Sequence, residues 1–145
     1  MPLGDKQTVT KERTLIVINM PGGGVQDIDG SDLLWLRKAF DGEWKGATML
    51  QLAGDRIYSN ETMDDLSNKF DQADVPLVEF SAPESARTKL LVSAQRVRQV
   101  VDSDPVIYDE KAKSVLIFPT RLRLAVRETP DEARKKLQDA GAQVA

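Results

Sequence analysis

Three glycines follow a strand-like apolar run and could bind an anion through their backbone N–H groups. They are Gly22, Gly23 and Gly24. A phosphate-binding loop places such N–H groups at a helix N-terminus and adds a Lys and a Ser or Thr. Here Asp27 and Asp29 follow instead, and their carboxylates would repel a phosphate. We therefore expect a surface loop, and we keep a small-ligand or phosphate site at this loop as an alternative function.

Arginines gather in the alternating segment RLRLAVR near the end of the sequence. Alternation places Arg121, Arg123 and Arg127 on one face of a predicted strand. RNA recognition would add aromatic side chains for base stacking, and residues 119–145 contain none. The formal net charge of the chain is −3. We therefore expect a solvated or protein-facing sheet surface, and we do not expect nucleic acid as a partner.

The side chains that most often carry catalysis or bind transition metals are missing. The 145 residues include no His and no Cys. This excludes Ser-His-Asp and Cys-His nucleophiles, disulfides and zinc-thiolate sites. The acidic stretch DIDGSD at 27–32 does not match a calcium loop, because Asp32 stands where that loop needs glycine. We therefore expect no enzymatic activity, no metal and no cofactor.

Apolar spacing predicts a βαββαβ order for residues 13–80. Strands are expected at 13–19, 46–52, 56–60 and 76–80, and helices at 31–40 and 61–70. The first helix would begin at Ser31 and bury Leu33, Leu36 and Phe40. This is the order of a ferredoxin-like sandwich. We expect an α+β protein with this core, preceded by a flexible arm at residues 1–12.

Residues 81–145 are expected to extend that core with a helix, a β-hairpin, a strand and a C-terminal helix. The stretch SAPE supplies Ser81 and Glu84 for a capping box and predicts a helix to about Val101. The runs PVIYD (105–109) and SVLIF (114–118) predict the hairpin. Thr129 would cap the last helix and Gly141 would end it. The pattern does not indicate an internal repeat.

Residues 104–142 resemble the propeptides of bacterial subtilisin-like serine proteases. The shared features are a hairpin, a Pro-Thr step into an alternating strand, a Pro-Asp-Glu helix start and a helix that ends in Ala-Gly-Ala. The resemblance implies a ferredoxin-like, non-catalytic protein that assists folding of a protease and blocks its cleft with a C-terminal tail. That tail would be Gly141, Ala142, Gln143, Val144 and Ala145.

These patterns predict a non-enzymatic protein-binding or regulatory module, with a protease as a candidate partner. The contact surface would combine the three arginines with the tail. The alternatives are a self-assembling scaffold subunit and the small-ligand binder named above, and an oligomer stays open. Charge is uneven, at −6 over residues 1–80 and +3 over 81–145. No run approaches the roughly 20 apolar residues of a membrane span, so we expect a cytoplasmic chain with no membrane partner.

Overall fold

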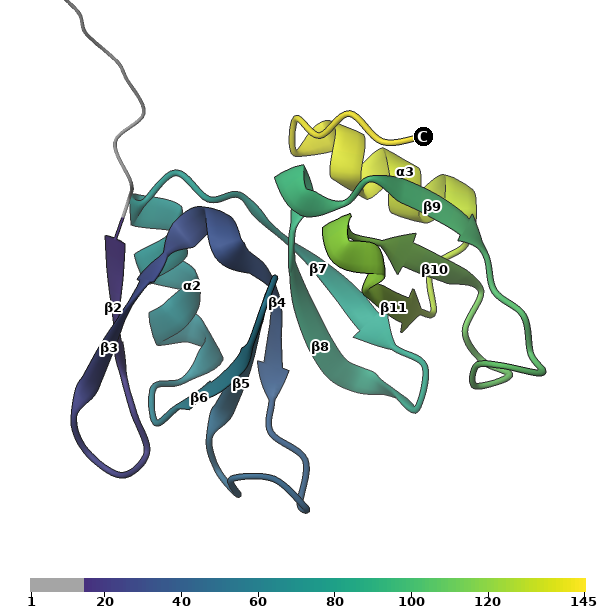
Figure 1. Ribbon diagram of the computed structural model, residues 1–145. Helices are drawn as coiled ribbons and strands as arrows, with labels where there is room; N and C mark the ends of the chain where they lie inside the picture. Colours follow the sequence, from purple (N-terminus) through teal and green to yellow (C-terminus); the bar gives the residue numbers. More distant parts are fainter. Residues whose placement is uncertain (1–14) are drawn as a thin grey trace, which may run out of the picture.

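The computed structural model describes residues 15–145, which form three stacked β-sheets and two α-helices (Figure 1). The strands are β2 (Leu15–Asn19), β3 (Val25–Asp29), β4 (Leu33–Lys38), β5 (Thr48–Leu52), β6 (Arg56–Ser59), β7 (Leu77–Ala82), β8 (Ser85–Ser93), β9 (Gln99–Asp102), β10 (Ser114–Ile117) and β11 (Arg123–Val126). The helices are α2 (Met63–Gln72) and α3 (Pro130–Asp139), with short 3-10 turns η1 (Gly30–Asp32), η2 (Ala94–Arg96) and η3 (Pro119–Arg121). The predicted arm at 1–12 lies outside these residues.

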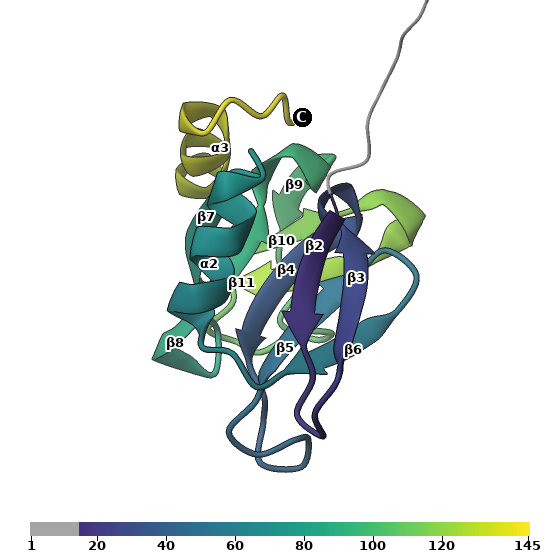
Figure 2. The same cartoon turned by 90° about the vertical axis from the view of Figure 1, so that its left-hand side faces the viewer.

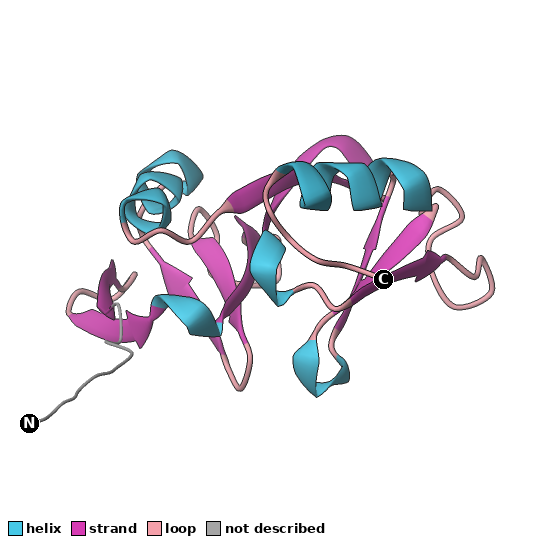
Figure 3. Ribbon diagram, turned by 90° about the horizontal axis from the view of Figure 1, so that it is seen from above, coloured by secondary structure: helices cyan, strands magenta, loops and turns pink. Residues whose placement is uncertain are grey.

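The sheets have the strand orders β2-β3, β6-β5-β4-β8-β7 and β11-β10-β9. In Figure 2 the β2–β3 hairpin lies in front of the five-stranded sheet, and Figure 3 shows both helices on one side of the strands. Two apolar cores fill the space between the layers. Leu34 and Met49 belong to one core, whereas Leu36 and Leu50 belong to the other. Strands β4 and β5 are therefore buried on both faces.

The chain contains two structural repeats with the same order of elements. Residues 15–74 contain β2, β3, η1, β4, β5, β6 and α2, and residues 77–141 contain β7, β8, η2, β9, β10, β11 and α3, with the extra turn η3 between β10 and β11. The strand registers agree as well. Leu50 pairs with Leu36 and Ile57 in the first repeat, and in the second Leu116 pairs with Val100 and Leu124. The structure therefore contains a repeat that the sequence pattern did not indicate.

In the first repeat, a glutamate and a lysine fasten the helix to the first strand. Glu61 Oε2 accepts a hydrogen bond from the backbone N–H of Asn19 at 3.1 Å. The ammonium group of Lys69 lies 2.7 Å from Glu61 Oε1 and also donates to the carbonyl of Val17 at 2.7 Å. The lysine thus covers a carbonyl on the edge of β2, a position that would otherwise be open to another strand.

The second repeat uses the same residue types at the same positions. Glu128 accepts from the backbone N–H of Ser81 at 3.1 Å. Lys136 lies 3.5 Å from the Glu128 carboxylate and donates to the carbonyl of Glu79 at 2.8 Å. Because four partners recur in equivalent places, these glutamate–lysine pairs, which we call the helix clamps, belong to the fold itself.

The repeats are joined through the long hairpin β7–β8. Its strand β8 pairs with β4 of the first repeat, with Trp35 opposite Val92 and Leu36 opposite Leu91. The hairpin therefore supplies strands to its own repeat and also completes the sheet of the first one. This junction produces the five-stranded central sheet.

An α+β class is found, but the ferredoxin-like βαββαβ order is not. The predicted helix at 31–40 is strand β4, because Leu33–Arg37 are buried continuously between two cores. The predicted helix from Ser81 to about Val101 is strand β8 followed by β9. Pro83 and Glu84 form the turn from β7 to β8, and Leu90 and Val92 alternate toward one core. The extension at 81–145 is therefore not the expected helix, hairpin and helix.

Other expectations are confirmed. Strands β5 and β6 form the predicted hairpin, and α2, β7 and β11 occupy their predicted segments. Thr129 and Glu132 form the capping box of α3, and Gly141 follows this helix with a φ of +91°. The segment 105–109 is a turn instead of a strand, so β10 pairs with β9 and β11. Over residues 15–145, no helix is long and apolar enough to cross a membrane.

Candidate nucleic-acid interface

One carboxylate orders the loop at residues 39–47, between β4 and β5. Glu43 Oε1 accepts hydrogen bonds from the Arg37 guanidinium at 2.8 Å and from the Phe40 backbone N–H at 2.7 Å. Glu43 Oε2 accepts one from the Tyr58 hydroxyl at 2.9 Å. These donors, Arg37 above all, lower the pKa of Glu43 to about 2. The carboxylate is therefore ionised at neutral pH and holds the loop to the sheet.

Two aromatic side chains project from this ordered loop. Phe40 is 49% exposed and Trp44 is 57% exposed. The Arg37 guanidinium carbon lies 3.6 Å from the centre of the Phe40 ring, a cation–π contact that helps to fix this ring. A loop that is held in one conformation can present aromatic surface to a partner at little entropic cost.

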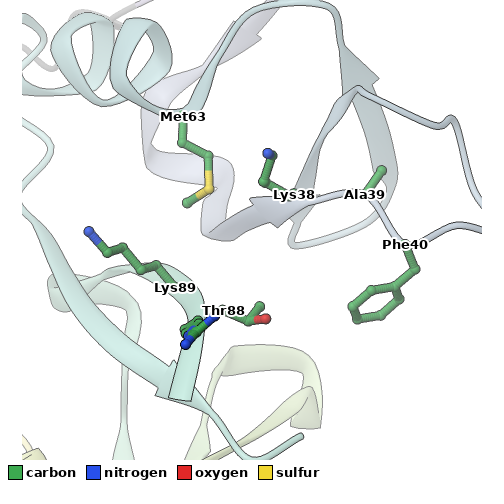
Figure 4. Close-up of a pocket in the computed structure, with 7 residues that line it drawn as sticks. Lys38, Ala39, Phe40, Met63, Thr88 and Lys89 are labelled. Carbon is green, nitrogen blue, oxygen red and sulfur yellow. The ribbon is translucent and has the colours of Figure 1, made fainter. Parts of the chain in front are cut away.

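A cavity of about 260 Å³ lies beside the loop (Figure 4). Its walls combine basic and apolar side chains from the end of β4, the loop that follows it, β8 and the first turn of α2: Lys38, Ala39, Phe40, Met63, Arg87, Thr88 and Lys89. In Figure 4, Lys38 and Met63 lie on one side of the opening, and Thr88 and Lys89 lie on the other. The fold thus brings cations from two strands, far apart in sequence, around one hollow.

The positive charge of this cavity is poorly neutralised by the protein. Lys89 has an exposed ion pair with Glu79 at 3.9 Å, and such pairs contribute little. Lys38 and Arg87 make no ion pair with any residue in the described part of the chain. Cations of this kind attract anionic groups, and the guanidinium fork of Arg87 suits a phosphate. We call Lys38, Arg87 and Lys89 the basic cluster.

The equivalent loop of the second repeat also presents apolar side chains. Between β9 and β10, Val106 is 91% exposed and Ile107 is 71% exposed. Asp104 accepts a hydrogen bond from the Val106 backbone N–H at 2.9 Å, and Asp109 accepts one from the Lys111 backbone N–H at 2.8 Å. In Figure 1 the β4–β5 loop lies at the bottom of the molecule, and the β9–β10 loop lies at its right-hand edge, beyond the β7–β8 turn. Each repeat therefore presents apolar side chains on the loop that follows its third strand.

The predicted arginine surface is only partly formed. Arg121 and Arg123 are exposed, but Arg121 belongs to η3, ahead of the strand. Arg127 is half-buried, and its Nε donates to the carbonyl of Ala82 at 2.9 Å. This bond fastens the end of β11 to the β7–β8 turn. Arg127 is therefore hydrogen-bonded within the fold, and the three arginines do not form one exposed surface.

The predicted partner-binding tail lies against its own sheet. The Val100 backbone N–H donates to the carbonyl of Ala145 at 3.1 Å, and the Ala145 N–H donates to the carbonyl of Arg98 at 3.4 Å. Ala142 is buried and Val144 packs against the core. Gln143 is exposed. Ala145, the last residue of this tail, therefore pairs with the edge of β9.

The glycine loop turns the chain between β2 and β3. The Gly23 N–H donates to the carbonyl of Met20 at 3.1 Å, and the Met20 N–H donates to the carbonyl of Gly24 at 3.1 Å. Gly23 and Gly24 have φ values of +87° and +76°, which side-chain-bearing residues rarely adopt. Gly22 completes the turn, and a strand follows it instead of a helix. The glycines are explained by hairpin geometry.

The acidic stretch at 27–32 serves a local structural role. Asp29 Oδ1 accepts from the backbone N–H of Ser31 at 3.0 Å and from its hydroxyl at 2.8 Å. These bonds begin η1. Within residues 15–145 there is no group of three or more His, Cys, Asp or Glu side chains placed to hold a metal ion.

Sequence reasoning missed the basic cluster because it assigned the wrong elements. A helix at 31–40 would bury Phe40, and a helix at 81–101 would separate Arg87 and Lys89 from Lys38. The available signal was the run LLWLRK, which is continuously apolar before its two cations. Such a run is typical of a strand buried on both faces. Identifying it would have placed Lys38 and Phe40 at a strand end.

The chain matches no family model and no curated protein. Among solved structures it is similar to a LytTr DNA-binding domain of a response regulator from Bacillus cereus. The TM-score is 0.51 at 12% identity, and the match covers 88% of this chain and 98% of the other. At this identity, the likeness establishes a shared fold.

This likeness corrects the functional expectation. The fold is one that carries DNA binding in its structural neighbour, whereas the sequence had led us to expect a protease-associated module, with scaffold and glycine-loop alternatives, and no nucleic acid. The expectations of a protease-associated module and of no nucleic-acid partner are therefore corrected by this likeness. The resemblance of residues 104–142 to subtilisin propeptides is a separate prediction that the comparisons leave untested. The arrangement of strands and helices in this chain is similar to that of the Bacillus cereus LytTr DNA-binding domain.

Proposed function

We propose that this chain is a DNA-binding domain. The observation that carries the proposal is the basic cluster, three cations around one cavity with Phe40 and Trp44 exposed beside it. The LytTr-like fold supports the proposal, since the neighbour of that fold is named as a DNA-binding domain. Non-enzymatic action and a cytoplasmic location remain part of the proposal, because DNA binding requires neither catalysis nor export.

Each part of the surface has a contact that suits its chemistry. The three cations would neutralise backbone phosphates, which supply much of the affinity of DNA-binding proteins. The exposed aliphatic groups Val106 and Ile107 could contact thymine methyl groups in a groove. Phe40 and Trp44 would add apolar contacts to sugars or bases. Phosphate contacts would fix position, and the two loops would read the DNA.

Binding must be local, because the chain as a whole is anionic. Its net charge of −3 repels DNA at long range. We therefore expect modest affinity that falls steeply with salt, with a log–log slope of about −2.7 for three phosphate contacts.

The test replaces the basic cluster as a unit. The variant Lys38→Ala, Arg87→Ala, Lys89→Ala is compared with Arg98→Ala, Arg123→Ala, Lys135→Ala, which removes the same number of exposed cations elsewhere. Affinity for a labelled mixed-sequence DNA duplex is measured by fluorescence anisotropy across a salt series. We expect roughly a tenfold or larger loss for the first variant and a flatter salt slope. Equal losses in both variants would refute the assignment of this surface.

A further inference from the structure

Strands β4 and β8 separate at one end of the central sheet. Their pairing ends at Leu36, which lies opposite Leu91. Continued by two residues, the same register would set Lys38 opposite Lys89, but no such pair forms between the described strands. These two lysines instead lie on two sides of the cavity of about 260 Å³ (Figure 4). The cavity is therefore the space that opens where the two strands part.

The separation leaves one edge of β8 without a neighbouring strand. On its other edge β8 stays paired with β7, where Ser81 lies opposite Lys89. On the edge that faces β4, no strand of the described chain pairs with residues 85–89. The backbone N–H and C=O groups of such an edge are open to other hydrogen-bonding partners. The cavity therefore has backbone polar groups in its wall as well as cations.

Charged and uncharged side chains occupy different depths of the cavity. The basic cluster is exposed, whereas Ala39, Met63 and Thr88 are half-buried. In Figure 4, Met63 and Phe40 lie toward opposite ends of the opening. None of the residues that line the cavity is acidic. A matching ligand therefore carries its negative charge at the rim and an apolar or aromatic group below it.

The ring of Phe40 is held from outside this cavity. The Arg37 guanidinium carbon lies 3.6 Å from the ring centre, and Arg37 lines a separate hollow of about 60 Å³. Arg37 does not line the larger cavity. The contact with Arg37 thus fixes the ring and leaves it free to contact an aromatic group of a ligand inside the cavity.

We propose that this cavity binds one unpaired nucleotide, with its base between the separated strands and its phosphate on the basic cluster. A base is flat, packs against aromatic and thioether groups such as Phe40 and Met63, and has polar edges for the open backbone of β8. The guanidinium fork of Arg87 suits the phosphate. The volume is below the roughly 300–1,000 Å³ of pockets for drug-sized ligands, so the cavity suits a single base.

This inference rests on the proposed function for the role of the three cations and names the ligand more closely. A fully paired duplex keeps its bases stacked and offers only its backbone to the cavity. An unpaired nucleotide offers a base as well. That nucleotide has two sources with the same chemistry, a DNA strand and a free nucleotide, and the experiments below distinguish them.

The first experiment compares three labelled DNA duplexes by fluorescence anisotropy. One is fully paired, one has an extra unpaired thymidine, and one has an abasic residue in place of that thymidine. The full chain should bind the thymidine duplex about tenfold more tightly than the other two, because base stacking adds to the phosphate contacts. Equal affinity for the thymidine and abasic duplexes excludes a nucleotide from a strand, while DNA binding itself stands. No binding to any duplex instead refutes the proposed function.

The second experiment uses thymidine 5′-monophosphate without DNA. At millimolar concentration it should shift the backbone amide NMR signals of residues 38–40 and 87–89, and inorganic phosphate should shift them less. These shifts support the free nucleotide as a source even if no duplex binds. Absence of nucleotide-dependent shifts, together with equal affinity for the thymidine and abasic duplexes, overturns the proposal.

The third experiment fills the cavity and keeps its cations. Thr88→Phe should abolish the preference for the unpaired thymidine and the nucleotide shifts, but should keep the affinity for paired duplex and its salt slope. Ala53→Phe, which lies in a separate hollow at the β5–β6 turn, should change neither. Thr88→Ile replaces Thr88→Phe if the latter is not folded by circular dichroism. A folded Thr88 variant that keeps the preference and the shifts contradicts binding in this cavity.

Discussion

The two repeats share what the fold needs and differ in what they present to a partner. Both contain a helix clamp, and their strand registers agree. They differ in the loop after the third strand: the first repeat has Arg37 and Glu43 to order its loop, whereas Val101 stands in the place of Arg37 in the second. The conserved parts therefore build the scaffold, and the divergent loops are where a function can be specified.

The largest expected effect tests whether the repeats unfold together. Phe70→Ala empties part of the first core and should cost about 3–5 kcal/mol of unfolding free energy. Leu137→Ala should cost about 2–5 kcal/mol in the other core. Because β4 and β5 belong to both cores, each variant should still unfold in a single transition. Two separate transitions in calorimetry would show that the repeats are independent.

The helix clamps should give a smaller effect that is similar in both repeats. Glu61→Gln and Glu128→Gln each weaken a half-buried acceptor of a backbone N–H and should cost about 1–3 kcal/mol in urea unfolding. Removing the exposed pair by Lys135→Ala should change stability by about 0.5 kcal/mol or less. A glutamate variant no worse than Lys135→Ala would contradict the role of that clamp.

The β4–β5 loop of the first repeat should respond to acid through Glu43. The pKa of Glu43 is lowered to about 2, so its ionised form stabilises the folded chain above its ordinary value of 4.5. This stabilisation is lost as the pH falls from 4.5 through about 2. In Glu43→Gln the dependence should disappear. The fluorescence of Trp44 as a function of pH reports the change in the loop, and the Trp44→Phe variant gives the signal that does not come from Trp44. If Glu43→Gln keeps the pH dependence of the original chain, the Glu43 carboxylate is not its cause.

The smallest expected effect on stability distinguishes an arginine that is hydrogen-bonded within the second repeat from one that is exposed. Arg127→Ala removes the bond to Ala82 and should cost about 1 kcal/mol. Arg123→Ala removes an exposed side chain and should stay within about 0.5 kcal/mol of the original chain. Thermal unfolding of both variants measures these losses of stability. A larger loss for Arg123→Ala than for Arg127→Ala would contradict the conclusion that Arg127, and not Arg123, stabilises the fold.

The elements that the sequence predicts correctly carry local chemical signals. The helices α2 and α3 begin at Thr62 and Thr129, whose side chains accept hydrogen bonds from the first turn. The segments that were missed are β4 and β8, in which burial depends on distant strands. Because β4 lies between two cores, its apolar run lacks the alternation that marks a strand with one exposed face.

The repeat was also within reach of the sequence. The segments RIYSNETMDDLSNKFDQA (56–73) and RLAVRETPDEARKKLQDA (123–140) share an arginine, the Glu-Thr pair, an aspartate, a lysine and the final alanine at equivalent positions. The glutamate and lysine are the helix clamps. The remaining strands differ in sequence because each needs only apolar side chains of suitable size, so the repeat is visible only where specific hydrogen bonds require particular residues.

Measuring DNA affinity with the basic cluster replaced tests the central claim most directly. If this end of the molecule binds DNA, Lys38→Ala, Arg87→Ala, Lys89→Ala should lose most of the binding and its salt dependence, while the matched replacement of Arg98, Arg123 and Lys135 should keep both. A folded original chain that shows no binding to mixed-sequence duplex DNA at low salt, or equal losses in the two variants, would contradict the account.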